Sequence, residues 1–209
     1  MFPTPKEIAE KHGLWAKKAL GQNFIFDLNL TRKIANSAGS LAGADVIEIG
    51  PGPGGLTRAL LESNAARVVV VEKDERCLPI LMQLQEIAGD RLIIVRDDAL
   101  KHALLHYPSP RKIVANLPYN VGTELLLHWL EEIAVDSSAY QSMTLMFQKE
   151  VAERIVAAHG SKEYGRLSVY AQWLCDIRYE MELPPGAFSP PPKVSSAVIT
   201  LTPRTVPLF

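Results

Sequence analysis

The sequence predicts an α/β protein with a Rossmann-like fold, in which helices flank a mostly parallel, seven-stranded sheet. Two observations support this prediction. Short β-branched runs alternate with helical stretches between Asp45 and Leu174, which is the pattern of repeated strand–helix units. The first of these runs leads directly into a glycine-rich turn at 50–55, and a helix follows that turn, as in nucleotide-binding crevices.

Composition narrows the class of protein. A chain of 209 residues with 47% hydrophobic and 22% charged side chains suits a single globular domain with a substantial core. No apolar run reaches membrane-spanning length, and the N-terminus lacks the apolar core of a signal peptide, so we expect a cytoplasmic protein without membrane contact. Cys77 and Cys175 do not suggest a disulfide framework, and no Cys/His spacing suggests a metal site.

The charge is nearly balanced but unevenly distributed. A net charge of −1 argues against a strongly basic nucleic-acid binder. Residues 1–33 nevertheless hold six Lys/Arg against three Asp/Glu, a local excess of +3. This excess permits a phosphate-facing patch, although charge alone favours an ordinary solvated surface.

The N-terminal stretch predicts two helices joined by a polar loop. Thr4-Pro5-Lys6-Glu7 is a capping box with proline at the first helical position, so a short helix should run to about His12. Asp27 is the expected N-cap of a second helix, which should end at Gly39.

The rest of the chain predicts the sheet. The expected parallel strands cover 46–49, 67–71, 91–95, 112–115 and 143–147, with helices near 124–133, 150–158 and 167–174. Pro79 fits the helix after the second strand only if that helix begins late. Two extended runs at 177–183 and 196–201 have only a proline-rich loop between them, so they should form a terminal antiparallel hairpin.

The glycine-rich turn predicts a nucleotide site. Glycines let the backbone approach a ligand, and Glu72 at the tip of the second strand is placed to accept both hydroxyls of a ribose. The pattern fits NAD as well as S-adenosylmethionine, but Glu48, two residues before the first glycine, favours the latter. Asp98 could accept a hydrogen bond from the adenine amino group, and Asp97 competes for that role. The structural alternative is a tight turn with an exposed acid.

A second motif follows the fourth strand, where an apolar run stops at Asn116-Leu117-Pro118-Tyr119. Pro118 restricts the backbone, so the Asn116 side chain and the Leu117 carbonyl can be held at fixed angles. These two oxygens suit a planar molecule with an exocyclic amino group, on which the Tyr119 ring could stack. The tetrapeptide alone fits an ordinary strand end and turn equally well.

Seven motifs fall in one order along the chain. They are Gly21-Gln22-Asn23-Phe24, the turn at 48–54, Glu72, Asp98-Ala99, Asn116-Leu117-Pro118-Tyr119-Asn120, Phe147-Gln148-Lys149-Glu150-Val151 and Phe188-Ser189-Pro190-Pro191-Pro192-Lys193-Val194. In this order they resemble the KsgA-type family of ribosomal RNA adenine N6,N6-dimethyltransferases, over residues from about Lys17 to Leu201. The proline-rich and Gln-Lys-Glu motifs are rarely seen outside this group.

The resemblance implies a class I methyltransferase core that uses S-adenosylmethionine and releases S-adenosylhomocysteine. The implied cofactor-binding residues are Gln22, Asn23, Ile25, Gly50, Gly52, Glu72, Asp98, Ala99 and Asn116. The implied catalytic residues are Asn116, Leu117, Pro118, Tyr119 and Phe188, with Tyr119 and Phe188 as the two aromatic faces for the target base. Lys149, Arg154 and Lys193 are possible contacts to RNA phosphates, or simply solvated surface.

The implied reaction is dimethylation of two adjacent adenosines near the 3′ end of small-subunit ribosomal RNA, within a pre-ribosomal subunit and by a monomer. Leu117 and the triple proline before Lys193 favour this over the erythromycin-resistance type, which modifies a large-subunit adenine. A non-catalytic RNA-binding assembly or transcription factor on the same fold is a further alternative. We expect an N-terminal arm over 1–40 and the core over 41–209, without the helical substrate-binding domain that usually follows in this family.

Overall fold

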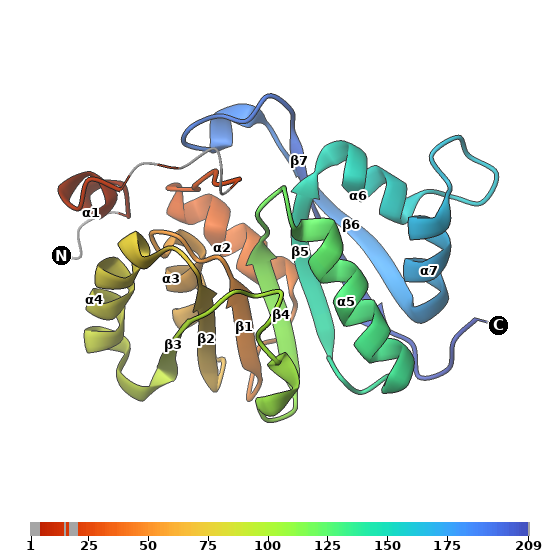
Figure 1. Ribbon diagram of the computed structural model, residues 1–209, viewed down its shortest axis with the longest axis horizontal. Helices are drawn as coiled ribbons and strands as arrows, with labels where there is room; N and C mark the ends of the chain where they lie inside the picture. Colours follow the sequence, from red (N-terminus) through yellow and green to blue (C-terminus); the bar gives the residue numbers. More distant parts are fainter. Residues whose placement is uncertain (1–4, 15, 17–20, 209) are drawn as a thin grey trace.

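A seven-stranded sheet forms the centre of the computed structural model, which describes residues 5–14, 16 and 21–208 (Figure 1). Its strand order is β3-β2-β1-β4-β5-β7-β6. The strands are β1 (Asp45–Ile49), β2 (Arg67–Glu72), β3 (Leu92–Arg96), β4 (Arg111–Asn116), β5 (Ser142–Gln148), β6 (Cys175–Leu183) and β7 (Ser196–Pro203).

Strands β1 to β5 run parallel, and β7 joins β5 and β6 by antiparallel pairing. The predicted fold class and the terminal hairpin are therefore confirmed. The last strand, β7, lies between β5 and β6, so β6 is the edge of the sheet. Burial explains this order, because the first six residues of β7 are buried whereas most residues of β6 are at least partly exposed.

Helices cover both faces of the sheet (Figure 1). They are α1 (Pro5–Lys11), α2 (Leu28–Ser37), α3 (Gly55–Leu61), α4 (Leu78–Ala88), α5 (Gly122–Val135), α6 (Lys149–Val156) and α7 (Arg166–Leu174), with short 3-10 turns at Glu75–Cys77, Gly89–Arg91, Leu104–His106 and Pro185–Ala187. Alternation along β2 shows the two layers, since Val68 and Val70 pack in the cluster with α2, α3 and α4, whereas Val69 and Val71 pack with α5, α6 and α7.

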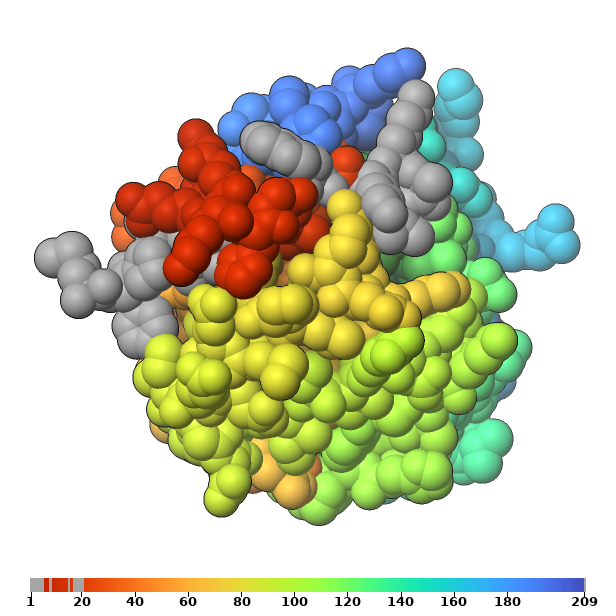
Figure 2. Space-filling model, turned by 60° about the vertical axis from the view of Figure 1, so that its left-hand side comes forward, coloured from red at the N-terminus to blue at the C-terminus, as the bar shows by residue number. Residues whose placement is uncertain are grey.

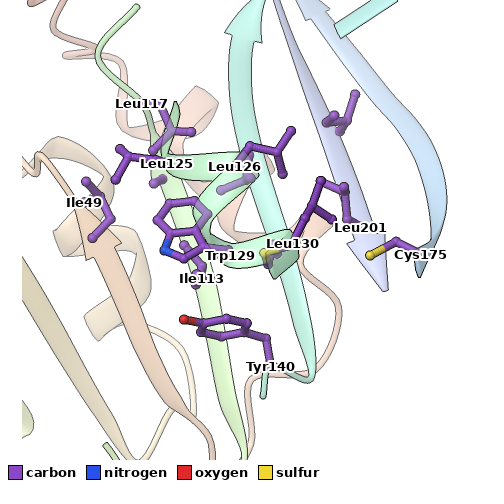
Figure 3. Packing of buried hydrophobic residues seen from close by; sticks show 14 of the residues in the cluster. Ile49, Ile113, Leu117, Leu125, Leu126, Trp129, Leu130, Tyr140, Cys175 and Leu201 are labelled. Atoms are coloured by element: carbon purple, nitrogen blue, oxygen red, sulfur yellow. The ribbon is translucent and has the colours of Figure 1, made fainter. Parts of the chain in front are cut away.

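Side chains of α5 pack tightly against β4 (Figure 3). Trp129 and Tyr140 are each 1% exposed, and they lie in one cluster with Ile113 of β4 and Leu130 of α5. Full burial of one such apolar side chain stabilises the fold by about 1.5–3 kcal/mol. The end of β4 therefore rests on a well-packed core.

The predicted element boundaries agree with the structure to within a few residues. The Asp27 carboxylate caps α2 by accepting from the amides of Asn29 at 2.8 Å and Leu30 at 3.2 Å, as predicted. The helix with Pro79 begins late, at Leu78, after a 3-10 turn. The predicted cap at Thr4 lies outside the described residues.

α1 lies against α4, where Nε2 of His12 is 3.1 Å from Nε2 of Gln83. Figure 2 shows this red segment beside the yellow α4 surface, with the blue proline-rich loop above it. α1 and the proline-rich loop, which are far apart in the sequence, thus lie on the same face of the molecule. Within the described ranges, no helix has the length and apolar character needed to cross a membrane.

The topology creates one crevice. From β1 the chain moves outward to β2 and β3, then returns to β4 on the other side of β1. In open α/β sheets ligands bind at such a reversal, outside the carboxyl ends of the strands. The residues that end the parallel strands at this edge are Ile49, Glu72, Arg96, Asn116 and Gln148.

Candidate functional site

A cavity of about 170 Å³ opens at this edge of the sheet. Residues from five separate sequence motifs line it. The predicted site residues on its wall are Gln22, Asn23, Ile25, Gly50, Gly52, Glu72, Asp98, Ala99, Asn116, Leu117, Pro118 and Tyr119. The structure therefore brings the predicted cofactor residues and the Asn-Leu-Pro-Tyr motif to a single site.

The glycine-rich turn fits between two other walls of the cavity. Gly50 has φ +63°, and a Cβ there would lie 3.5 Å from Cγ of Pro118. Gly52 has φ +54°, and a Cβ there would lie 2.8 Å from Cε1 of Phe24. At Gly55, a Cβ would meet the carbonyl oxygen of Ile25 at 2.3 Å, which is too close for any side chain. The turn thus lets other backbone and ring atoms approach closely.

Glu72 is buried at the end of β2, with 5% of its surface exposed. One carboxylate oxygen accepts from the amide of Gly52 at 3.0 Å, and the other accepts from the amide of Asp74 at 2.7 Å. Burial raises the pKa of Glu72. Because each carboxylate oxygen can accept more than one hydrogen bond, Glu72 can hold the turn and still accept from ligand hydroxyls.

Glu48 is a second buried carboxyl on the cavity wall, 2% exposed. Its Oε2 accepts from the Thr57 hydroxyl at 2.6 Å. Burial raises the pKa of Glu48 to about 8, so this carboxyl is largely protonated at neutral pH. The sequence indicated Glu48 only as a sign of cofactor preference; its protonation depends on burial that the sequence does not show.

Side-chain hydrogen bonds hold the loop at 21–26 over the cavity. Nε2 of Gln22 donates to Asp74 at 2.9 Å, and a guanidinium nitrogen of Arg76 donates to the amide oxygen of Gln22 at 3.3 Å. On the opposite side, Nδ2 of Asn116 donates to the carbonyl oxygen of Asn23 at 3.0 Å. Because the side-chain nitrogen of Asn116 faces the loop at 21–26, the side-chain oxygen of Asn116 points away from that loop.

Both acids after β3 line the cavity, and each has partners. Asp97 accepts from the amide of Asp98 at 2.7 Å and lies 2.9 Å from Nδ1 of His102. Asp98 accepts from Nζ of Lys73 at 2.7 Å and from the amide of Leu100 at 3.2 Å. The Lys73 ammonium holds the pKa of Asp98 below its ordinary value. The ion pair with exposed Lys73 is the more easily exchanged of these contacts.

Tyr119 stands at the edge of the cavity and contacts the start of β7. Its hydroxyl lies 2.5 Å from Oγ of Ser196. Burial raises the pKa of Tyr119, so the hydroxyl stays protonated at neutral pH. No sequence motif indicated Ser196 as its partner.

Phe188 lies outside the lining of the cavity. It is 5% exposed and packs in the core cluster that contains Phe24 and Leu183, and it is not among the described residues that line the cavity. The neighbouring Ser189 pairs with Phe24 through two backbone hydrogen bonds, of 2.8 and 3.1 Å. The structure therefore does not bring Phe188 to Tyr119, and its stacking role stays a prediction.

The predicted phosphate contacts lie outside the cavity. Lys149 is paired with Glu182 at 2.8 Å and lies 3.9 Å from Glu153. Arg154 and Lys193 are exposed, on α6 and in the proline-rich loop. Their role in RNA binding stays a prediction.

Several residues on the cavity wall were missed by the sequence analysis. Most of them adjoin a predicted motif in the chain, and this proximity was the only sequence feature that could have indicated them. Those without a predicted role are Ile49, Pro51, Pro53, Gly55, Leu56, Val71, Lys73, Asp74, Leu100, Val121 and Leu125. Gly21, Phe24, Glu48 and Asn120 were named only as parts of motifs, and Asp97 was the predicted alternative to Asp98.

Sequence relatives cover the whole chain. The family model described as ribosomal RNA adenine dimethylase matches residues 13–208. A curated relative from Jannaschia sp. (strain CCS1), named ribosomal RNA small subunit methyltransferase A, is 57% identical over 209 residues, which are 100% of this chain and 72% of the relative. A relative of the same name from Ruegeria sp. (strain TM1040) is 54% identical, over 100% of this chain and 74% of its own length.

Solved structures show the same fold. A dimethyladenosine transferase from Plasmodium falciparum superposes with a TM-score of 0.75 and 28% identity, over 87% of this chain and 63% of the other. The 23S rRNA methyltransferase ErmE gives a TM-score of 0.74 and 28% identity, over 90% of this chain and 72% of the other. The family match along 13–208 and the 57% identity to a curated member show that this chain belongs to the ribosomal RNA adenine dimethylase family.

Proposed function

We propose that this chain transfers methyl groups from S-adenosylmethionine to N6 of two adjacent adenosines near the 3′ end of small-subunit ribosomal RNA, in ribosome biogenesis. The observation that supports this most directly is that the Asn116-Leu117-Pro118-Tyr119 motif and Glu72 open onto one cavity. A nucleoside held by its ribose at Glu72 then lies in the same cavity as a group that can accept from an adenine amino group. The curated relatives named above are small-subunit methyltransferases.

The cavity fits S-adenosylmethionine by the chemistry of its walls. Gly50 and Gly52 place bare backbone on the cavity wall, so no side chain of theirs enters the cavity. Glu72 would accept from the ribose hydroxyls and Asp98 from the adenine amino group, with Ala99 beside that ring. Gln22, Asn23 and Ile25 would cover the methionine end. When bound, S-adenosylmethionine supplies a methyl group on a positively charged sulfur.

The target nitrogen needs orientation more than a base. The lone pair of adenine N6 is conjugated with the ring, so N6 is a weak nucleophile. The Asn116 side-chain oxygen and the Leu117 carbonyl would accept hydrogen bonds from its two N–H groups and favour a more pyramidal, reactive nitrogen. The Tyr119 hydroxyl is protonated at neutral pH, which argues against proton abstraction by a tyrosinate. Catalysis is then mainly positioning and electrostatics.

The target adenosine must leave its stack to enter the cavity, because enzymes that modify a base take it out of the helix. Tyr119 would provide one aromatic face for the flipped base. Phe188 would provide the second only if the proline-rich loop moves when RNA binds, since the ring is packed in the core here. Lys149, Arg154 and Lys193 would meet phosphates outside the cavity.

A large-subunit substrate is the second candidate, because the ErmE structure also matches this fold at 28% identity. The 57% identity to a small-subunit methyltransferase favours the first. We further propose that the chain acts as a monomer on an assembled pre-ribosomal small subunit in the cytoplasm. Methylation of particles but not of naked RNA would support that choice of substrate.

A methyl-transfer assay tests the proposal. The chain is incubated with labelled S-adenosylmethionine and with small or large subunits that lack the modification. We expect label in the small-subunit RNA, recovered as N6,N6-dimethyladenosine, and a larger loss of transfer than of cofactor binding in Tyr119→Ala. Label in the large subunit alone would support the second candidate. Tight RNA binding without transfer would support the non-catalytic alternative.

A further inference from the structure

One hydrogen bond connects the Asn-Leu-Pro-Tyr motif to a distant strand. The hydroxyl of Tyr119 lies 2.5 Å from Oγ of Ser196, a residue 77 positions further along the chain. Either oxygen can donate. Both groups are removed from bulk solvent, because Ser196 is buried and Tyr119 is partly buried. Breaking this bond would leave a buried hydroxyl without a partner and would destabilise the folded protein, so the folded protein favours the bond.

Ser196 is a rigid anchor. It is 0% exposed and is the first residue of β7. Its backbone lies between two strands, in register with Gln148 of β5 and Leu183 of β6. The neighbouring Ser195 carbonyl accepts from the amide of Lys149 at 2.9 Å, which fixes the turn before the strand. The backbone of Ser196 is therefore held on both sides by β5 and β6, so only one side-chain torsion sets the position of Oγ.

The Tyr119 ring borders open space, so packing alone does not fix its side-chain torsions. Tyr119 lines the main cavity of about 170 Å³ and also a second, at most water-sized cavity of about 10 Å³, whose other walls include Thr123, Met146 and Gln148. Pro118 restricts the backbone before the ring, but it does not fix the side-chain torsions. Without the bond to Ser196, the ring could rotate toward the main cavity, because the second cavity is too small to hold it.

We infer that Ser196 is a positioning residue for methyl transfer, because its hydroxyl holds the Tyr119 ring at the angle on which the target adenine stacks. This inference rests on the proposed function. Ser196 is not on the wall of the main cavity formed by the described residues, so it acts through Tyr119. Misplacement of a reacting group by about 1 Å can lower a rate by about 10²-fold, so a modest shift of the ring is enough to matter.

Kinetics of matched variants test the inference. We expect Ser196→Ala to lower kcat about tenfold while the KM and Kd for S-adenosylmethionine stay within about twofold, a loss of roughly 1.4 kcal/mol in the transition state. Tyr119→Phe should show the same loss, and the double variant should be no worse than either single variant. Thr200→Val is the control, because it breaks a different buried hydrogen bond between hydroxyls, that of Thr144 in β5 with Thr200 in β7, at 3.0 Å.

A measurement on the free protein gives a readout that does not depend on activity. Carbon relaxation of ¹³C-labelled tyrosine reports the order parameter of the Tyr119 ring, whose signal is assigned by its loss in Tyr119→Phe. Ser196→Ala should lower this order parameter, and Thr200→Val should leave it as in the wild type.

The outcomes separate the two proposals. Wild-type kcat and an unchanged order parameter in Ser196→Ala would overturn the inference, as would losses that multiply in the double variant. If the unaltered chain methylated neither subunit, the proposed function would fail. In that case a rigid Tyr119 ring in Ser196→Ala would also reject the anchor, whereas a mobile ring would support it.

Discussion

Replacing Glu48 by glutamine should change how the stability of the fold depends on pH. Glu48 is 2% exposed, and burial raises its pKa to about 8. In the unfolded chain a glutamate has a pKa of about 4.3. Between these two values the unfolded chain loses the proton and the folded protein keeps it. The wild type therefore loses stability as pH rises through this window, and the loss ends above the folded pKa.

The size of the effect follows from the same pKa. Each pH unit inside the window changes the free energy of unfolding by about 1.4 kcal/mol per proton. From pH 6 to pH 8, and with partial ionisation near pH 8, the wild type should lose about 2 kcal/mol relative to Glu48→Gln. Glutamine has nearly the same shape, and its amide oxygen can accept from the Thr57 hydroxyl as Glu48 does at 2.6 Å.

Urea unfolding of both proteins at pH 6, 7 and 8 measures the difference. Glu62→Gln is the control, because the exposed ion pair with Arg32 lowers the pKa of Glu62 and keeps its titration outside this range. The free-energy gap between Glu48→Gln and the wild type should widen with pH, and the gap for Glu62→Gln should not. A constant gap for Glu48→Gln would refute the reasoning, since it would mean that Glu48 is already ionised at pH 6.

Three further predictions concern the site. Glu72→Ala should weaken S-adenosylmethionine binding by about 1–3 kcal/mol in calorimetry, because ligand hydroxyls and two backbone amides lose their acceptor; unchanged affinity would remove Glu72 from the ribose role. Asp74→Ala should speed S-adenosylhomocysteine dissociation severalfold in stopped-flow, because Gln22 loses its 2.9 Å acceptor, and an unaltered rate would contradict this. Gly55→Ala should lower the melting temperature, since its Cβ would lie 2.3 Å from a carbonyl oxygen. Gly186→Ala should leave the melting temperature unchanged, because a Cβ at Gly186 would have no other atom within 4 Å.

The fold could be predicted because its determinants are local. Each parallel strand is a short apolar run, rich in β-branched residues in all but β5, and a parallel sheet places the carboxyl ends of those runs at one edge. Motifs that ended in Gly50, Glu72 and Asn116 therefore had to meet, and they line one cavity. Strand ends differed by one or two residues, as at β3, where Arg91 belongs to a 3-10 turn instead.

The contacts that hold the site in shape could not be predicted, because they join residues far apart in the chain. Gln22 meets Asp74 across 52 positions, and Tyr119 meets Ser196 across 77. A single sequence carries no signal for such pairs. The location of Phe188 has the same cause, since it depends on the backbone pairing of Ser189 with Phe24.

That pairing has a consequence for the order in which the protein matures during its synthesis. Phe24 leaves the ribosome early, whereas Ser189 and the β7 strand that completes the sheet leave late. At ~5–20 residues per second, on the order of ten seconds or more separate the two. The covering loop therefore waits for its partner while the residues between Phe24 and Ser189 are synthesised. A nascent chain should gain affinity for S-adenosylmethionine only after β7 has emerged, so the ligand can stabilise the completed sheet but not earlier intermediates.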